Sequence, residues 1–159
     1  AIFYSHMVVK YTINILKYVF FTLVILTFSF PASSELSVEE IIKGRKALFS
    51  KNYSTAKRVQ AVASKGDFEK AKSLMLEMSE NYKILIDYFP ENTQEGFKTE
   101  ALPIIWEDKE NFDNLMTKAS TDMIELTKII EDSDDIRGTL QKFMWANCKA
   151  CHSKYRAPH

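Results

Sequence analysis

Apolar residues recur every three or four positions along most of the chain, and glycine is scarce. This spacing is typical of amphipathic helices, and the strict alternation of a half-buried strand is absent. The first such segment begins just after Ser37, and Glu40 follows three positions later, which predicts a capping box. We therefore expect a first helix from about Val38 to about Ser64.

The breaks in this pattern separate a second and a third helix. Gly66 suits a helix end and Asp67 suits an N-cap, so a second helix should start at Phe68. The longest loop spans residues 89–96. Pro103 is expected to open the third helix, because proline suits a first helical turn.

A polar turn at 131–135 precedes a fourth helical segment, which carries apolar residues from Ile136 to His152. Four amphipathic helices joined mostly by short connections predict an all-α fold, an antiparallel four-helix bundle. Bundles of this kind commonly hold a cofactor between facing helices.

The N-terminal segment differs from the rest of the chain. An uncharged apolar run, Tyr18 to Phe30, follows two lysines and precedes the small residues at 31–34. This is the pattern of a secretory signal peptide, and the run is shorter than the about 20 apolar residues that usually span a membrane. We expect residues 1–34 to be a cleaved signal that leaves no stable membrane anchor, with a retained anchor as the alternative. Residues 35–159 would then form the folded domain.

Charge is balanced, with 21 basic and 21 acidic residues. The first 34 residues hold two lysines and no acid, so residues 35–159 carry 19 bases and 21 acids. Because no basic stripe or polybasic tail is present, nucleic acid is not an expected partner.

The strongest chemical signal is Cys148-Lys149-Ala150-Cys151-His152, a C-x-x-C-H pattern typical of covalent haem attachment. At about 100° per residue, Cys151 and His152 project within about 60° on either side of Cys148. Two thiols can then add to the two vinyl groups of a haem while the imidazole reaches the iron from the same side. The pattern predicts one haem c, bound through Cys148 and Cys151, with His152 as the proximal iron ligand.

Three other interpretations of the cysteines compete. A redox dithiol would be expected in a βαβ context and does not need the histidine. A disulfide between cysteines three apart in a helix has poor geometry. A zinc site usually has four ligands, and residues 35–159 offer only the two cysteines, His152 and His159. A haem-free zinc or structural helical module remains the alternative from another class.

Three further features accompany the haem motif: two residues that follow it, a pair on the first helix, and a loop with a tryptophan. They are Tyr155 with Arg156, Arg45 with Phe49, and Phe89-Pro90-Glu91-Asn92-Thr93 with Trp106. With them, the chain resembles the cytochrome c′ family, the class II cytochromes c, over about residues 36–157. That family has its haem motif near the C-terminus and is built as a four-helix bundle.

The resemblance implies a role for each of these residues. His152 would bind one side of a five-coordinate, high-spin iron, and Phe49 would block the other side without binding it. Arg45 would pair with a haem propionate, although a solvated helix charge is the alternative. Arg156 would lie against the proximal imidazole.

The two remaining aromatic residues are expected near the haem. Tyr155 would pack on its face, and Trp106 would contact it or belong to the core. The chain departs from the family just before the first cysteine, where Trp145-Ala146-Asn147 replaces small residues. This departure predicts altered packing at the haem edge.

The expected function is that of an exported, periplasmic haem protein that binds NO or CO, carries electrons for an unknown redox partner, or does both. An apolar distal side suits NO and CO because neither needs a hydrogen bond to bind. No distal histidine is available for peroxidase chemistry, so we do not expect an enzyme. Family members are often dimers through their first two helices, which makes a homodimer an expectation.

The alternative on the same fold is a low-spin, six-coordinate electron carrier with a methionine ligand. Relatives of that kind place the methionine on the first helix, and no methionine occurs between Val38 and Ser64. The spacing of the later methionines favours core packing.

Overall fold

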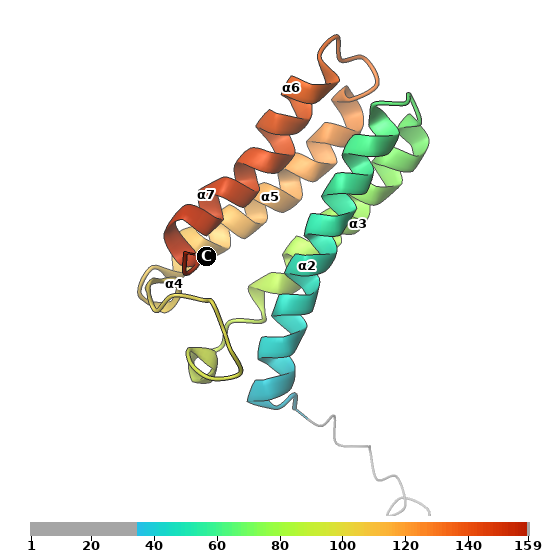
Figure 1. Cartoon of the computed structure of the whole chain (residues 1–159). Helices are drawn as coiled ribbons and strands as arrows, with labels where there is room; N and C mark the ends of the chain where they lie inside the picture. Colours follow the sequence, from blue (N-terminus) through green and yellow to red (C-terminus); the bar gives the residue numbers. More distant parts are fainter. Residues whose placement is uncertain (1–34, 159) are drawn as a thin grey trace, which may run out of the picture. The chain divides into compact units, whose positions relative to one another are not determined.

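A computed structural model describes residues 35–158. The predicted signal peptide and His159 lie outside the described residues. Helices α2 (Val38–Ala63) and α3 (Phe68–Ile86) lie side by side, and α5 (Lys109–Ile129) lies beside the last helical segment of the chain (Figure 1). The most extensive packing joins α3 to α2 on one side and to α5 on the other. The predicted four-helix bundle is confirmed.

Local signals set the bounds of the first two helices as predicted. The Ser37 hydroxyl accepts a hydrogen bond from the backbone N–H of Glu40, whose carboxylate accepts one from the Ser37 N–H at 2.8 Å. Gly66 has a φ of 78°, the left-handed conformation that glycine adopts readily after a helix. The Asp67 carboxylate then caps α3 by accepting from the backbone N–H of Lys70 at 3.2 Å. The capping box and the break are both confirmed.

The third helix is interrupted, which the spacing of apolar residues did not indicate. A short α4 (Ile104–Glu107) ends at Asp108, whose φ of −125° and ψ of 40° lie outside the helical region, and α5 begins at Lys109. The Asp108 carboxylate accepts a hydrogen bond from the Tyr155 hydroxyl at 2.7 Å and pairs with Lys154. The residue at the break is therefore in direct contact with the last helix.

The fourth helical segment has three parts. It consists of α6 (Ile136–Leu140), a π-helical turn η2 (Gln141–Trp145) and α7 (Ala146–Tyr155). A π turn inserts extra backbone into a helix and is frequent at functional sites. Here it immediately precedes the helix that carries the haem motif.

The segment between α3 and α4 is tied to the C-terminus. It contains a short 3₁₀ turn, η1 (Glu91–Thr93), and an antiparallel bridge pairs Ala101 with Arg156. The backbone N–H of Leu102 donates to the Tyr155 carbonyl at 3.0 Å. The end of α7 is therefore fixed against the loop that precedes α4.

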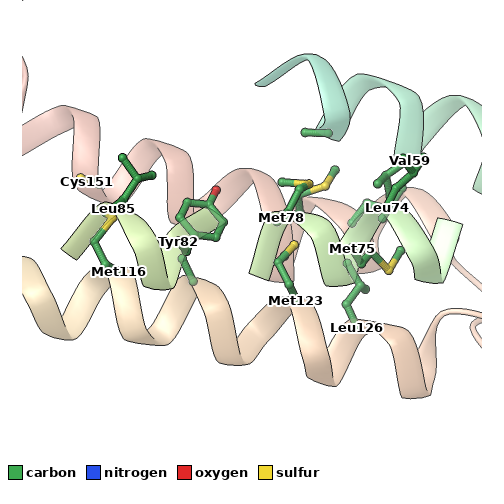
Figure 2. Close-up of a cluster of buried hydrophobic side chains, with 14 of the residues drawn as sticks. Val59, Leu74, Met75, Met78, Tyr82, Leu85, Met116, Met123, Leu126 and Cys151 are labelled. Atoms are coloured by element: carbon green, nitrogen blue, oxygen red, sulfur yellow. The ribbon is translucent and has the colours of Figure 1, made fainter. Parts of the chain in front are cut away.

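A continuous row of buried side chains fills the space between α3 and α5. In Figure 2 the row runs from Met75 and Leu126 through Met78 and Met123 to Leu85, Met116 and Cys151. Unbranched methionines fill irregular gaps well, which suits helices that diverge along their length. Among helices within residues 35–158, none has the length and apolar character needed to cross a membrane.

Candidate haem-binding site

A cavity of about 710 Å³ lies at the α7 end of this row. Its walls come from α2, α3, α4, α5, η2, α7 and the loop before α4. Such a volume is in the range of about 300–1,000 Å³ found for pockets that enclose a whole cofactor. Seven of the eight residues predicted for the site line it: Cys148, Cys151, His152, Arg45, Phe49, Tyr155 and Arg156. The sequence motif therefore coincides with this cavity.

The two cysteines form one wall, and both are free thiols. Cys151 is buried and Cys148 is half-buried. Burial raises the pKa of the Cys148 thiol, and burial together with the neighbouring Cys148 raises the pKa of Cys151 to about 12. Both groups are consequently protonated thiols at neutral pH.

Phe49 of α2 and His152 of α7 both line the cavity, and their rings lie edge to face. Their ring centroids are 6.4 Å apart, and the ring planes meet at 67°. A nitrogen of the Arg156 guanidinium lies 3.4 Å from His152 Nδ1, and Arg156 Nε donates to the Glu100 carboxylate at 3.0 Å. Glu100 therefore holds a positive charge beside the imidazole.

Arg45 is buried, with 2% of its surface exposed, so it is not a solvated helix charge. One terminal nitrogen donates to the Tyr88 carbonyl and the Thr93 hydroxyl, and the other donates to the Thr93 carbonyl and the Thr99 hydroxyl, at 2.7–3.2 Å. Burial lowers the pKa of Arg45 to about 10, which leaves it charged at neutral pH. Its guanidinium also lies 4.7 Å from the centre of the Phe89 ring. Arg45 thus holds the loop between α3 and α4 against α2.

Trp106 is the one predicted site residue that does not line the cavity. Its indole N–H donates to the carbonyls of Phe89 and Pro90, and its ring lies 6.0 Å from that of Phe89. The geometry favours the core interpretation, since Trp106 supports the loop that Arg45 holds. Tyr155 lines the cavity, and its hydroxyl is fixed by the hydrogen bond that it donates to the Asp108 carboxylate.

Several cavity residues were not predicted for the site. Asn52 lies three positions after Phe49, a spacing that could have indicated it, because both residues then share one face of α2. Tyr82 and Met116 also line the cavity, although their spacing was that of core residues. The Tyr82 hydroxyl lies 3.9 Å from Cys148 Sγ, and burial raises its pKa. Trp145 lines the cavity too and donates to Gln60 at 3.0 Å.

Two observations bear on the alternative hypotheses. Within residues 35–158, no group of three or more histidine, cysteine, aspartate and glutamate side chains is arranged to hold a metal ion. Of the described methionines, Met116 is the one that lines the cavity, whereas the others are buried in the hydrophobic core. The zinc interpretation therefore has no support from the described geometry, and Met116 is the methionine relevant to a six-coordinate iron.

The sequence profile of the family described as Cytochrome C′ matches residues 40–156. This chain belongs to the cytochrome c′ family. A cytochrome c′ of Rhodopseudomonas palustris is 29% identical over 121 residues, covering 74% of this chain and 82% of the relative. A cytochrome c-556 of Agrobacterium tumefaciens is 33% identical over 101 residues, covering 60% of this chain and 80% of the relative.

Solved structures of cytochromes c′ have the same fold. The Rhodopseudomonas palustris protein has a TM-score of 0.63 at 28% identity, covering 75% of this chain and 97% of that one. The protein from Thermochromatium tepidum has a TM-score of 0.68 at 21% identity, covering 79% and 100%. The resemblance seen in the sequence is confirmed, and the chain is a haem protein of this family. The cavity fits that cofactor, because it is mostly apolar and both cysteines and the histidine of the C-x-x-C-H motif line it.

Proposed function

We propose that the cavity holds one haem c attached to Cys148 and Cys151, and that the protein binds NO or CO, exchanges single electrons, or does both. The observation that carries the proposal is the position of Phe49, which lines the cavity from a different helix than His152, with its ring 6.4 Å from the imidazole. His152 would bind the iron on one side, and the Phe49 ring, which cannot coordinate, would cover the other. When bound, the haem supplies an iron that takes a diatomic ligand and a single electron.

The surrounding residues each have a task in this proposal. Phe49 excludes water and larger molecules from the distal side. The Arg156 cation, fixed by Glu100, would lie beside His152 Nδ1 and draw electron density from the imidazole, which weakens it as an electron donor to the iron. Tyr155 and Asp108 brace α7, which keeps the proximal ligand in place. Arg45 lines the cavity, and a haem propionate is its proposed partner there, in addition to the loop groups it already binds.

A relative supports the choice of ligand. The L16V variant of the cytochrome c′ from Alcaligenes xylosoxidans was solved as a nitric oxide complex, and it has the same fold at 22% identity and a TM-score of 0.66. At this identity the likeness concerns the fold, so NO binding by this chain is our proposal. No catalytic turnover is proposed.

Export to the periplasm, with cleavage of residues 1–34, is part of the same proposal and is supported by the pattern of that segment.

We also propose a homodimer through α2 and α3. Large apolar side chains are exposed on these two helices, at Tyr53, Leu76 and Ile84. Sedimentation equilibrium of the haem-loaded protein tests it: a single monomeric species at micromolar concentration would contradict the dimer.

The alternative is a low-spin electron carrier. Met116 gives it one specific observation, because its side chain lines the cavity. Its position on α5, rather than on α2 beside Phe49, favours five-coordinate iron.

Absorption spectra of the haem-loaded protein decide between the two. We expect a broad reduced visible band that shifts when CO is added. Sharp α and β bands that CO does not change would establish a sixth protein ligand, and Met116→Leu would then remove it.

Covalent attachment is tested separately with Cys148→Ala/Cys151→Ala. The wild type should retain haem after acid–acetone extraction, and the double variant should lose all of it. Haem that stays with the double variant under denaturing electrophoresis would contradict attachment through these thiols.

A further inference from the structure

Asn52 carries an unpaired donor inside the cavity wall. Its side chain is 3% exposed and lines the cavity. Its amide nitrogen is the one buried side-chain polar atom without a hydrogen-bond partner between residues 35 and 158. An unpaired buried amide is costly, so such a group usually has a partner that completes the site.

A neighbouring asparagine fixes the orientation of this amide. Asn81 of α3 donates from Nδ2 to Asn52 Oδ1 at 2.9 Å, and Asn81 is itself buried. Because Asn52 Oδ1 already accepts from Asn81, the Asn52 NH₂ group is the part of the side chain that remains available to a partner in the cavity. Tyr82 also lies beside Asn52, and its polar interaction with the Asn52 side chain opposes the rise that burial causes in the Tyr82 pKa. No acceptor, however, lies in hydrogen-bonding geometry with Asn52 Nδ2.

The position of Asn52 restricts what can accept its hydrogen bond. It lies one helical turn beyond Phe49, the residue that faces His152, and hence on the distal side of the cavity. Its neighbour Tyr82 contacts Cys148, the attachment point for a vinyl group. On a haem the propionates leave from the edge opposite the vinyl groups, so a propionate is a poor partner for Asn52. A ligand bound to the iron opposite His152 is an acceptor that this position does allow.

We propose that Asn52 donates a hydrogen bond to a diatomic ligand bound on the distal side, so that this pocket favours ligands that gain negative charge on the iron. The inference rests on the proposed function and makes it more specific. Phe49 restricts the size of the ligand, and Asn52 discriminates by polarity. The pocket is therefore more selective for NO over CO than one lined by apolar groups alone.

The test is the C–O stretching frequency of the ferrous CO adduct, measured by infrared spectroscopy for the wild type and Asn52→Leu. A nearby donor weakens the C–O bond, so the stretch should move to higher frequency in the variant. The ratio of NO to CO affinity should fall about two- to ten-fold, the effect of losing one ordinary hydrogen bond. An unchanged frequency would overturn the role of Asn52.

Two further variants keep the result interpretable. Asn52→Leu/Asn81→Leu replaces both partners by apolar groups, which avoids leaving Asn81 unpaired, and it should show the same shift. Ser79→Ala removes a buried hydrogen bond of 2.8 Å to Ser120 in the core, where neither serine lines the cavity. That control should leave the CO stretch unchanged; an equal shift there would show that general loosening causes the effect. A wild type that binds no CO would instead contradict the proposed function itself.

Discussion

The bundle has two ends that are built differently. At the end remote from the cavity, Val59, Ala63, Met75, Met123 and Leu126 are almost completely buried and pack against one another (Figure 2 shows four of them). At the cavity end, the side chains that hold the structure include buried polar groups. These are Arg45, Asn52, Asn81 and Thr93.

The difference shows which part of the fold the polypeptide completes by itself. A close-packed apolar core is stabilised by its own side chains, without a cofactor, and the fold loses stability whenever a cavity is created in it. The cavity end instead encloses about 710 Å³, and hydrogen bonds such as that from Arg45 to the Thr93 carbonyl hold its loop in place. We expect the remote end to be insensitive to haem loading and the cavity end to gain most of its stability from it.

Arg45→Ala should produce the largest effect on the haem-free chain. The substitution removes four hydrogen bonds from a buried cation to the loop between α3 and α4. We expect a loss of about 4 kcal/mol in the free energy of unfolding, because hydrogen bonds to charged groups are strong and their partners stay buried. Urea denaturation followed by circular dichroism measures it.

Arg58→Ala is the matched control, since Arg58 lies on the same helix and is exposed. It should change stability by less than about 0.5 kcal/mol. Equal effects of the two substitutions would show that the loop does not depend on Arg45, and the contrast between the two ends would then fail.

The sequence predicted the remote end more completely than the cavity end. Helix bounds at that end, near Gly66 and Asp67, depend on local capping, which neighbouring residues encode. Asp108, where the third helix breaks, is bonded to Tyr155, 47 positions away, and no local pattern indicates such a contact. Spacing indicates only that a residue faces inward, not whether it meets the core or a cavity.

Arg45, Asn52 and Met116 illustrate that limit. The family resemblance singled out Arg45 but not its bonds to Thr93 and Thr99, which become visible only when the loop is placed. Met116 has the same spacing as Met123, yet one lines the cavity and the other does not. The three haem-motif residues were found because their chemistry lies within a single helical turn.

A pair of truncations separates packing from ligand access. Met123→Ala at the remote end should cost about 3 kcal/mol of stability, because a buried methionine leaves a cavity, and it should leave CO binding unchanged. Phe49→Ala removes a half-buried ring beside an existing cavity, so it should cost less stability and increase the CO association rate. Chemical denaturation and flash photolysis measure the two quantities. An unchanged CO rate in Phe49→Ala would mean that another residue covers the iron.

The smallest effect concerns acid stability at the cavity end. Lys154, and then the Tyr155 hydroxyl and Asn111, hold the pKa of Asp108 at about 2, below its ordinary value of 3.8. The unfolded chain therefore binds a proton more readily than the folded one, so the stabilisation is complete above pH 4 and is lost as the pH falls from about 4 to 2.

In a series of thermal denaturations, Asp108→Asn should lower Tm at neutral pH and flatten the decrease of Tm between pH 4 and 2. Asp132→Asn, a change at an exposed position, should keep the wild-type slope. A wild-type slope in Asp108→Asn would mean that the contacts of Asp108 with Tyr155 and Lys154 do not contribute to stability. The C-terminal helix would then be held at the cavity by the backbone bridge to Ala101 and by packing alone.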